Sequence, residues 1–307
     1  MKKVLLVFVA LLATIALFGC KEKEFKFDGT FLAFEESVHR NAPQVVFVTV
    51  TIQDGEIVGY QIDTRQGRRT GDGAETPYAW SWNAQTKREL GDAYNMKAAS
   101  PIGKEWYEQA AVIEAYWLEN GLDAVEVDGD GYITNIAGAS MRDAYTAVAK
   151  KAVENAKAGK FVAIYTSGTD LYSAELTLNK KGQIETLLLD VLQSTRNAVT
   201  GTFEWRPLSK QELGNDYGMK GAGGYVFRDG AWVAEGQCTL EWWEQVQLIT
   251  DYIKANGWTD NLQPVAQRGG SLNGTDLLPE LAGATIRTAG YYTVLKSLFD
   301  MASPSVK

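Results

Sequence analysis

Alternating apolar and polar residues form two matching pairs of segments in this chain. In the first pair, residues 45–52 and 56–62 flank an Asp-Gly sequence. In the second pair, residues 171–178 and 183–189 flank a short polar segment that ends in glycine. Alternation with a period of two on both sides of a glycine-containing turn is typical of a β-hairpin. The pattern therefore predicts one antiparallel hairpin in each half of the chain.

A different period, with apolar residues three or four positions apart, follows each hairpin and predicts helices. The first stripe consists of Trp106, Ala110, Ile113 and Trp117 in one half and of Trp242, Val246, Ile249 and Ile253 in the other. The second stripe, which ends each half, consists of Tyr145, Val148, Ala152 and Ala156 and of Tyr291, Leu295, Leu298 and Ala302. The segments around Trp82 and Trp205 predict one more strand each. Because strands come first and helices follow, the predicted fold class is α+β, with an antiparallel sheet packed with helices in each half.

Longer stretches of sequence also occur twice. Residues 87–97, KRELGDAYNMK, return as residues 210–220, KQELGNDYGMK. The pentapeptide EWYEQ at residues 105–109 returns as EWWEQ at residues 241–245. Because the order of these features is the same in both copies, the sequence predicts a tandem duplication rather than a solenoid.

The duplication sets the expected domain boundaries. We predict a first domain over residues 27–158 and a second over residues 159–307. The second copy has additional residues near Gly221–Gly236 and Pro264–Asn273, and both stretches are rich in glycine and polar residues. Such composition predicts loops. With 45% hydrophobic residues, the chain has enough apolar material for two cores of ordinary size.

A short string of small residues is repeated as well. It consists of Ala137, Gly138, Ala139 and Ser140 in the first half and of Ala282, Gly283, Ala284 and Thr285 in the second. Each copy precedes the last helical stripe of its half, so we predict that this helix begins at the string. A helix N-terminus offers free N–H groups and a positive dipole end, which suit a phosphate, and small residues allow close approach. The alternative is that Ser140 and Thr285 serve only as N-caps.

The first residues of the chain predict its location. Lys2 and Lys3 precede an apolar run over residues 4–18, which is too short for a comfortable transmembrane span. A cysteine directly after Gly19 resembles the bacterial lipobox, which implies cleavage before Cys20 and lipid on that residue. We therefore predict a lipoprotein signal peptide over residues 1–19 and a lipidated Cys20 with a charged tether over residues 20–26. A plain secretory signal is the alternative.

The net charge and the kinds of residue present argue against several classes of function. The formal net charge is −8, which argues against nucleic acid as a partner. Beyond Cys20 the chain has only Cys238, so no zinc set and no intrachain disulfide is expected. We expect no metal site: the single histidine, His39, reads as a surface residue, and the acidic turn at residues 128–131 reads as a hairpin turn. No catalytic residue stands out, so the chain either binds a ligand or takes its chemistry from a cofactor.

The repeated Ala-Gly-Ala-Ser/Thr string, preceded by a hairpin with a glycine turn, resembles the FMN-binding domain found in a subunit of sodium-pumping and Rnf-type redox complexes. In that family a flavin transferase joins the phosphate of FMN to the Ser or Thr hydroxyl. The lipidated cysteine, the charged tether and the two domains are similar to two-domain flavinylated lipoproteins of bacterial extracellular electron transfer. The family string usually has Asp and Ser/Thr further upstream. Here these positions hold Thr134 and Ala137 in one copy and Pro279 and Ala282 in the other.

The resemblance implies two covalent FMN groups, on Ser140 and Thr285. An isoalloxazine ring needs a flat apolar slot, and we expect an aromatic residue and a methionine to line it in each half. These residues are Tyr94, Met96, Tyr217 and Met219, for which core packing is the alternative. For Trp106 and Trp242, which begin the helical stripes, we favour core packing.

The predicted function is that of an electron carrier rather than of an enzyme with its own substrate. The protein would be anchored by lipid to the outer face of the cell membrane. Its expected partners are a flavin transferase, a membrane quinone-linked electron donor and an extracellular electron acceptor. The alternative is a lipoprotein that binds a ligand or acts as a sensor on the same duplicated scaffold, without redox chemistry.

Overall fold

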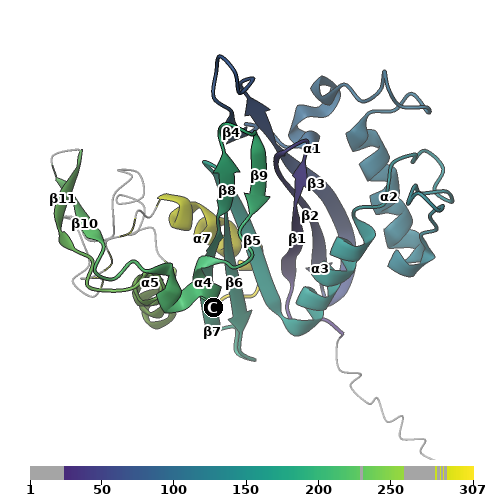
Figure 1. Cartoon of the computed structure of the whole chain (residues 1–307). Helices are drawn as coiled ribbons and strands as arrows, with labels where there is room; N and C mark the ends of the chain where they lie inside the picture. The colour runs from purple at the N-terminus through teal and green to yellow at the C-terminus, as the bar shows by residue number, and fades with distance from the viewer. Residues whose placement is uncertain (1–23, 229–230, 259–280, 282–283, 285, 287–288) are drawn as a thin grey trace, which may run out of the picture.

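The computed structural model describes residues 24–228, 231–258, 281, 284, 286 and 289–307. Its fold is α+β, as predicted, with antiparallel sheets that carry helices (Figure 1). Several predictions fall outside the described residues. They concern the signal peptide, Cys20, Ala282, Gly283, Thr285 and the expected loop over Pro264–Asn273.

The first half contains one antiparallel sheet in the order β1-β2-β3-β4. Its strands are β1 (Gly29–His39), β2 (Ala42–Gln53), β3 (Glu56–Thr70) and β4 (Ala79–Trp82). The predicted hairpin is confirmed as β2 and β3, and the predicted Trp82 strand is confirmed as β4. Strand β1 was not predicted. It connects to β2 through Arg40 and Asn41, whose φ angles of 52° and 58° give a tight left-handed turn without a glycine to signal it.

The helices of the first half follow its sheet. They are α1 (Lys87–Leu90), η1 (Gly91–Tyr94), α2 (Trp106–Asn120), η2 (Leu122–Ala124) and α3 (Thr146–Ala158). The predicted stripe of α2 is buried, and Gly121 ends the helix as expected. Helix α2 packs on β3, and α3 packs on β1 and β2. The two long helices therefore cover one face of the sheet (Figure 1).

The second half also begins with antiparallel strands that are followed by helical elements. Its strands are β5 (Lys160–Ser167), β6 (Asp170–Leu178), β7 (Ile184–Leu192), β8 (Ser194–Asn197) and β9 (Thr202–Trp205). They form a sheet in the order β5-β6-β7 and a separate β8-β9 pair. Its helical elements are α4 (Lys210–Leu213), η3 (Gly214–Tyr217), α5 (Trp242–Asn256) and α7 (Ala289–Ala302). The predicted hairpin is confirmed as β6 and β7.

One predicted loop of the second half is a hairpin instead. Residues Gly223–Arg228 form β10 and residues Ala231–Gln237 form β11, and the two strands pair antiparallel. The prediction of a loop over Gly221–Gly236 was therefore wrong. Its glycines indicated irregular structure, but the backbones of the two segments pair from Tyr225–Ala234 to Arg228–Ala231.

The two halves share one hydrophobic core, whereas the composition had suggested two. The rings of Phe31 and Phe161, on β1 and β5, stack with their centroids 4.2 Å apart. Trp82 and Trp205 lie 6.1 Å apart, and the Trp205 indole donates to the Ser37 carbonyl. Helix α7 packs on β5 and β6 and also contacts β1, while α3 also contacts β5. One connected cluster of buried residues therefore includes both halves.

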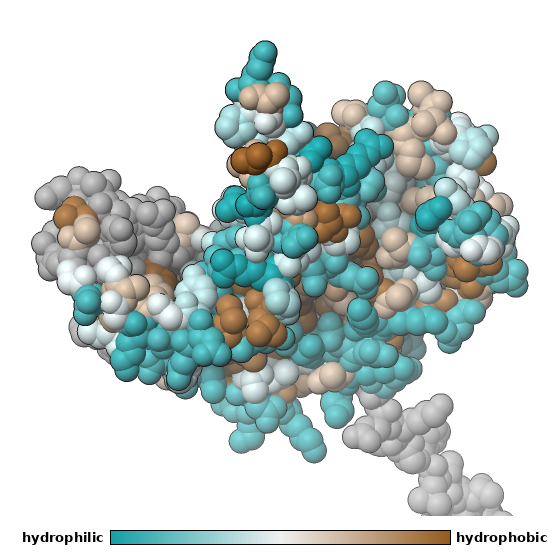
Figure 2. Space-filling view, in the orientation of Figure 1, coloured by the Kyte–Doolittle hydropathy of each residue, from teal (hydrophilic) through white to brown (hydrophobic). Residues whose placement is uncertain are grey.

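Most of the visible surface is polar, with apolar side chains in small separate patches (Figure 2). The most exposed large apolar residue among those described is Val199, in the β8-β9 turn, with 76% of its surface accessible. Scattered residues of this kind are ordinary on a folded surface. Within the part of the chain that the structure describes, no helix has the length and apolar character needed to cross a membrane.

Candidate functional site

Ser140 lies in an irregular segment before α3 and not at its N-terminus. Helix α3 begins at Thr146, so the prediction that the helix starts at the small-residue string was wrong. Two features explain this. The Ile133 N–H donates to the Met141 carbonyl, which holds the string against a neighbouring extended segment. Asp143 then accepts from the N–H groups of Tyr145 and Thr146 and caps the helix six residues after Ser140.

Gln109 of α2 fixes the position of Ser140. Its Oε1 atom accepts from the Ser140 N–H at 2.8 Å and from the Ser140 hydroxyl at 3.3 Å. The Gln109 side chain is completely buried, and its Nε2 atom donates to the Ser100 hydroxyl and to the Lys104 carbonyl. This network places a half-buried serine hydroxyl beside the first turns of α2.

Lys104 brings a positive charge to the same segment. Gly138 has a φ angle of 88°, and a Cβ atom there would lie 2.8 Å from the Lys104 Nζ. The positive φ angle favours glycine at this position, and the absence of a side chain leaves room for the lysine to approach. Ala137 is exposed, and Ala139 is half-buried. Because α3 begins at Thr146, the helix dipole that we expected at Ser140 is not located there.

Tyr94 and Met96 approach the same end of α2. Tyr94 ends η1, and the left-handed Asn95, with a φ angle of 59°, turns the chain back. Glu105, the buried N-cap of α2, accepts from the Met96 N–H at 2.8 Å. Tyr94 and Met96 are both half-buried and pack against the core. The structure thus brings Met96 and Ser140 to side chains one turn apart on α2, Glu105 and Gln109.

The second half has matching contacts where it is described. The Met219 N–H donates to Glu241 at 2.8 Å, and the Gln245 amide contacts the Met219 sulfur at 3.5 Å. Tyr217 and Met219 are half-buried, as Tyr94 and Met96 are. Ala284 is fully buried, and the other three residues of this string lie outside the described part of the chain. The position that corresponds to Lys104 holds Leu240, so this cation is specific to the first half.

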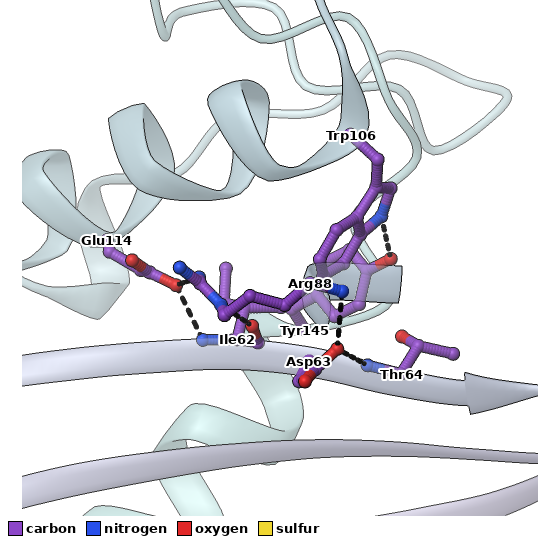
Figure 3. A network of polar contacts seen from close by, with 7 residues as sticks. All are labelled: Ile62, Asp63, Thr64, Arg88, Trp106, Glu114 and Tyr145. Atoms are coloured by element: carbon purple, nitrogen blue, oxygen red, sulfur yellow. Dashed lines mark hydrogen bonds and ion pairs between the residues drawn. The ribbon is translucent and has the colours of Figure 1, made fainter. Parts of the chain in front are cut away.

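Trp106 and Trp242 belong to the core, as we favoured. Both are almost fully buried. The Trp106 indole donates to the Tyr145 hydroxyl at 3.1 Å (Figure 3), and the Trp242 indole donates to the Tyr291 hydroxyl at 2.8 Å. These bonds link the first turn of α2 to the start of α3, and the first turn of α5 to α7. The tryptophans thereby hold the two long helices of each half together.

A lysine lies over each of these aromatic clusters. The Lys87 Nζ is 5.1 Å from the Tyr94 ring centre and 5.5 Å from that of Trp106. Burial lowers the pKa of Lys87 to about 8, and the nearby Asp63 carboxylate opposes this shift. Lys210 lies at 4.8 Å from Tyr217 and 5.4 Å from Trp242. Each cluster therefore combines an amphipathic cation with two aromatic faces.

The remaining candidates behave as surface features. His39 is exposed, as expected, although it ends β1 rather than lying in a loop. The Asp128 carboxylate accepts from the N–H groups of Asp130 and Tyr132, which confirms the predicted turn. Among the described residues, no three His, Cys, Asp or Glu side chains come together in a way that could hold a metal ion.

Sequence reasoning missed the two residues that organise the site. Gln109 is the last residue of the repeated EWYEQ pentapeptide, so its recurrence at Gln245 was an available signal. No comparable sequence pattern marks Lys104. Its contact is with Gly138, which is more than thirty residues away in the chain and comes close only in the folded protein.

Comparison with known proteins yields only short or weak similarities. No protein-family model matches the chain. A protein from Desulfitobacterium hafniense named chlorophenol reductase is 53% identical over 36 residues, which is 12% of this chain and 11% of that protein. A solution NMR structure from Clostridium thermocellum is 23% identical, covers 42% of this chain and 91% of its own, and has a TM-score of 0.27.

Proposed function

We propose that this protein is a flavin-carrying electron-transfer lipoprotein, with FMN joined covalently to Ser140 and to Thr285. The observation that carries the proposal is the Ser140 hydroxyl, which is half-buried and held by Gln109, in a segment where the Lys104 ammonium lies beside Gly138. Thr285 is included in the proposal only because the sequence around it repeats the sequence around Ser140. The matching contacts of Met96 with Glu105 and of Met219 with Glu241 support a common design for the two halves.

The residues around Ser140 fit a phosphoester. Ester formation removes the hydrogen bond from the Ser140 hydroxyl to Gln109. The hydrogen bond from the Ser140 N–H to Gln109 does not involve the hydroxyl and can remain. The residue therefore keeps its position after modification. Lys104 supplies a cation for the phosphate, which is needed because the N-cap of α2 is the acidic Glu105. The absence of bulk at Gly138 and Ala139 gives the phosphate room.

The other residues of the site would orient the flavin ring. Tyr94 and Met96 offer a polarisable apolar surface on the same end of α2 as Ser140. The flavin supplies one- and two-electron chemistry when it is bound, and the protein supplies attachment and orientation. A lipid on Cys20 would keep the carrier on the outer face of the membrane, between a quinone-linked donor and an extracellular acceptor.

The test is flavin attachment in a host that makes a flavin transferase. We expect the full chain to be yellow and to gain the mass of two FMN groups. Ser140→Ala should remove one group, Thr285→Ala the other, and the double variant both. A colourless chain of unmodified mass would contradict the proposal and would favour a ligand-binding lipoprotein without redox chemistry.

Two matched controls separate attachment from folding. Ser100→Ala removes the other hydroxyl on Gln109 and should leave both FMN groups in place. Lys104→Gln should lower the fraction of chains modified at Ser140, whereas Lys97→Gln, on an exposed lysine of the same connection, should not. Loss of FMN in the Ser100 variant equal to that in Ser140→Ala would show that the Gln109 network, and not the acceptor oxygen, decides the result.

A further inference from the structure

A cleft of about 260 Å³ lies between strand β7 and helix α5 of the second half. The strand contributes the consecutive residues Thr186–Leu189, and α4 contributes Gln211. The helix contributes Trp243, Gln247, Thr250, Asp251 and Lys254. The strand is an edge strand, because the order of its sheet is β5-β6-β7. None of the predicted flavin residues lines the cleft, so the inference is independent of the proposed function.

The first half fills the corresponding place with its own side chains. Ile62, Arg88 and Glu114 occupy the positions that correspond to Leu189, Gln211 and Thr250 in the two copies. The Glu114 carboxylate accepts from the Ile62 N–H at 2.6 Å and pairs with the Arg88 guanidinium (Figure 3). Arg88 Nε also donates to the Ile62 carbonyl at 3.0 Å. A carboxylate thus sits on the strand edge in this half.

The second half keeps one of these bonds and loses the other. Gln211 Nε2 donates to the Leu189 carbonyl at 2.9 Å, as Arg88 does to Ile62. Thr250 is too short to replace Glu114, and its hydroxyl donates to the Gln247 carbonyl of its own helix at 3.1 Å. Among the described residues, no side chain accepts from the Leu189 N–H in the way that Glu114 accepts from Ile62. The cleft opens where the carboxylate is missing.

We propose that this cleft binds a small organic monocarboxylate, whose carboxylate group takes the place of the Glu114 carboxylate. It would accept from the Leu189 N–H, and the exposed Lys254 at the cleft supplies the countercharge. A short apolar tail would pack on Leu187 and Trp243. Asp251 also lines the cleft, so a second negative charge on the ligand is disfavoured.

The direct test is a titration of the purified, isotope-labelled full chain with sodium butyrate, followed at the backbone amides by NMR. We expect a saturable shift of the Leu189 amide. Butyramide, which has the same shape without the charge, should leave that amide in place. The absence of a saturable butyrate shift, or an equal shift with butyramide, would overturn the proposal.

Variants decide whether the cleft takes a carboxylate in the manner of Glu114. Thr250→Glu provides an internal carboxylate, so it should shift the Leu189 amide without ligand and abolish the butyrate response. Thr250→Val, of nearly the same volume as threonine, should keep the response. Lys254→Gln should weaken butyrate binding about threefold, because the lysine is exposed. An unchanged butyrate response in Thr250→Glu would contradict the assignment.

The reverse exchange tests the same idea in the first half. Glu114→Thr should open a matching cleft and give the Ile62 amide a butyrate response that the wild type lacks. The neighbouring Arg88 should make this new site bind more tightly than the natural one. Failure of a folded Glu114→Thr variant to respond at Ile62 would overturn the equivalence on which the proposal is built. If that variant does not fold, Thr250→Glu still decides the question.

Discussion

The two halves of the protein contain similar strands and helices, but the contact between the long helix and the sheet differs between them. In both, a short helix with a capping box, Thr86 with Glu89 or Ser209 with Glu212, precedes a long helix. In the first half the half-buried Arg88–Glu114 ion pair links that long helix to the sheet, while the second half has a cleft at the corresponding place. The arrangement of strands and helices therefore does not depend on the ion pair, because capping, aromatic packing and strand pairing are common to both halves.

The same comparison applies to the candidate flavin sites. Glu105 and Glu241 hold the backbone of Met96 and Met219 in matching ways. In the first half Lys104 lies beside the small-residue string, and the position that corresponds to it in the second half holds Leu240. The parts that hold the protein together are therefore shared, whereas the charged groups that would contact a ligand differ between the halves.

The largest expected effect comes from breaking the ion pair. Glu114→Ala leaves the Ile62 N–H and the Arg88 guanidinium without their carboxylate, so the free energy of unfolding should fall by about 2–4 kcal/mol. Thr250→Ala, at the matching position, removes a hydroxyl that bonds only within its own helix and should cost less than about 1 kcal/mol. Urea unfolding of both variants measures the two values. Equal losses of unfolding free energy in the two variants would contradict the conclusion that the residue at this position links the helix to the sheet in the first half and not in the second.

The next effect depends on pH and involves Lys87. Its pKa in the folded protein is about 8, against an ordinary value of 10.5, because burial disfavours the charged form. Between these values the unfolded chain binds more protons than the folded one, so this lysine makes stability rise with pH across that window. Relative to Lys87→Met, the wild type should gain about 2 kcal/mol between pH 7 and pH 10.5, a value reduced for partial exposure.

Urea unfolding at a series of pH values, carried out on both proteins, measures this gain. The comparison between the two proteins removes the contribution of other groups that titrate in the same range. A difference in unfolding free energy that stays constant, or that moves in the opposite direction, would show that burial does not penalise the charged Lys87.

The smallest expected effect concerns the tryptophan–tyrosine hydrogen bond that is present in both halves. Tyr145→Phe and Tyr291→Phe each remove the hydroxyl that accepts from a buried indole, Trp106 or Trp242. Each should lower the free energy of unfolding by about 1 kcal/mol, because one buried N–H loses its partner. Chemical denaturation of the two variants under the same conditions gives the comparison. Values that differ by more than about 1 kcal/mol would break the equivalence of the two clusters.

The periodicity of the hydrophobic residues was enough to predict most of the strands and long helices. The β2-β3 and β6-β7 hairpins alternate cleanly around glycine-containing turns, and the stripes of α2 and α5 end at Gly121 and Gly257. Strand β1 was missed because its second half, from Glu35, is largely exposed and polar and gives no alternation. The start of α3 was misplaced because Asp143, and not Ser140, makes the capping bonds.

The candidate site could be predicted only in its parts. The repeated motifs pointed to Ser140, Tyr94 and Met96, but the sequence does not say what brings them together. That role belongs to Glu105, which binds Met96 nine residues before it, and to Gln109, which binds Ser140 thirty-one residues after it. The Lys104 approach to Gly138 likewise depends on the packing of two connections against α2. Contacts of this kind follow from the fold and have no local signature.

The most direct test of the central claim is tryptic peptide mapping of the full chain made together with a flavin transferase. The sequence has no Lys or Arg between Lys104 and Arg142, so Ser140 lies in a single peptide over residues 105–142. This peptide should carry the mass of one FMN group, and fragmentation should place that group on Ser140. An unmodified peptide, or FMN on any other residue of it, would contradict attachment at Ser140.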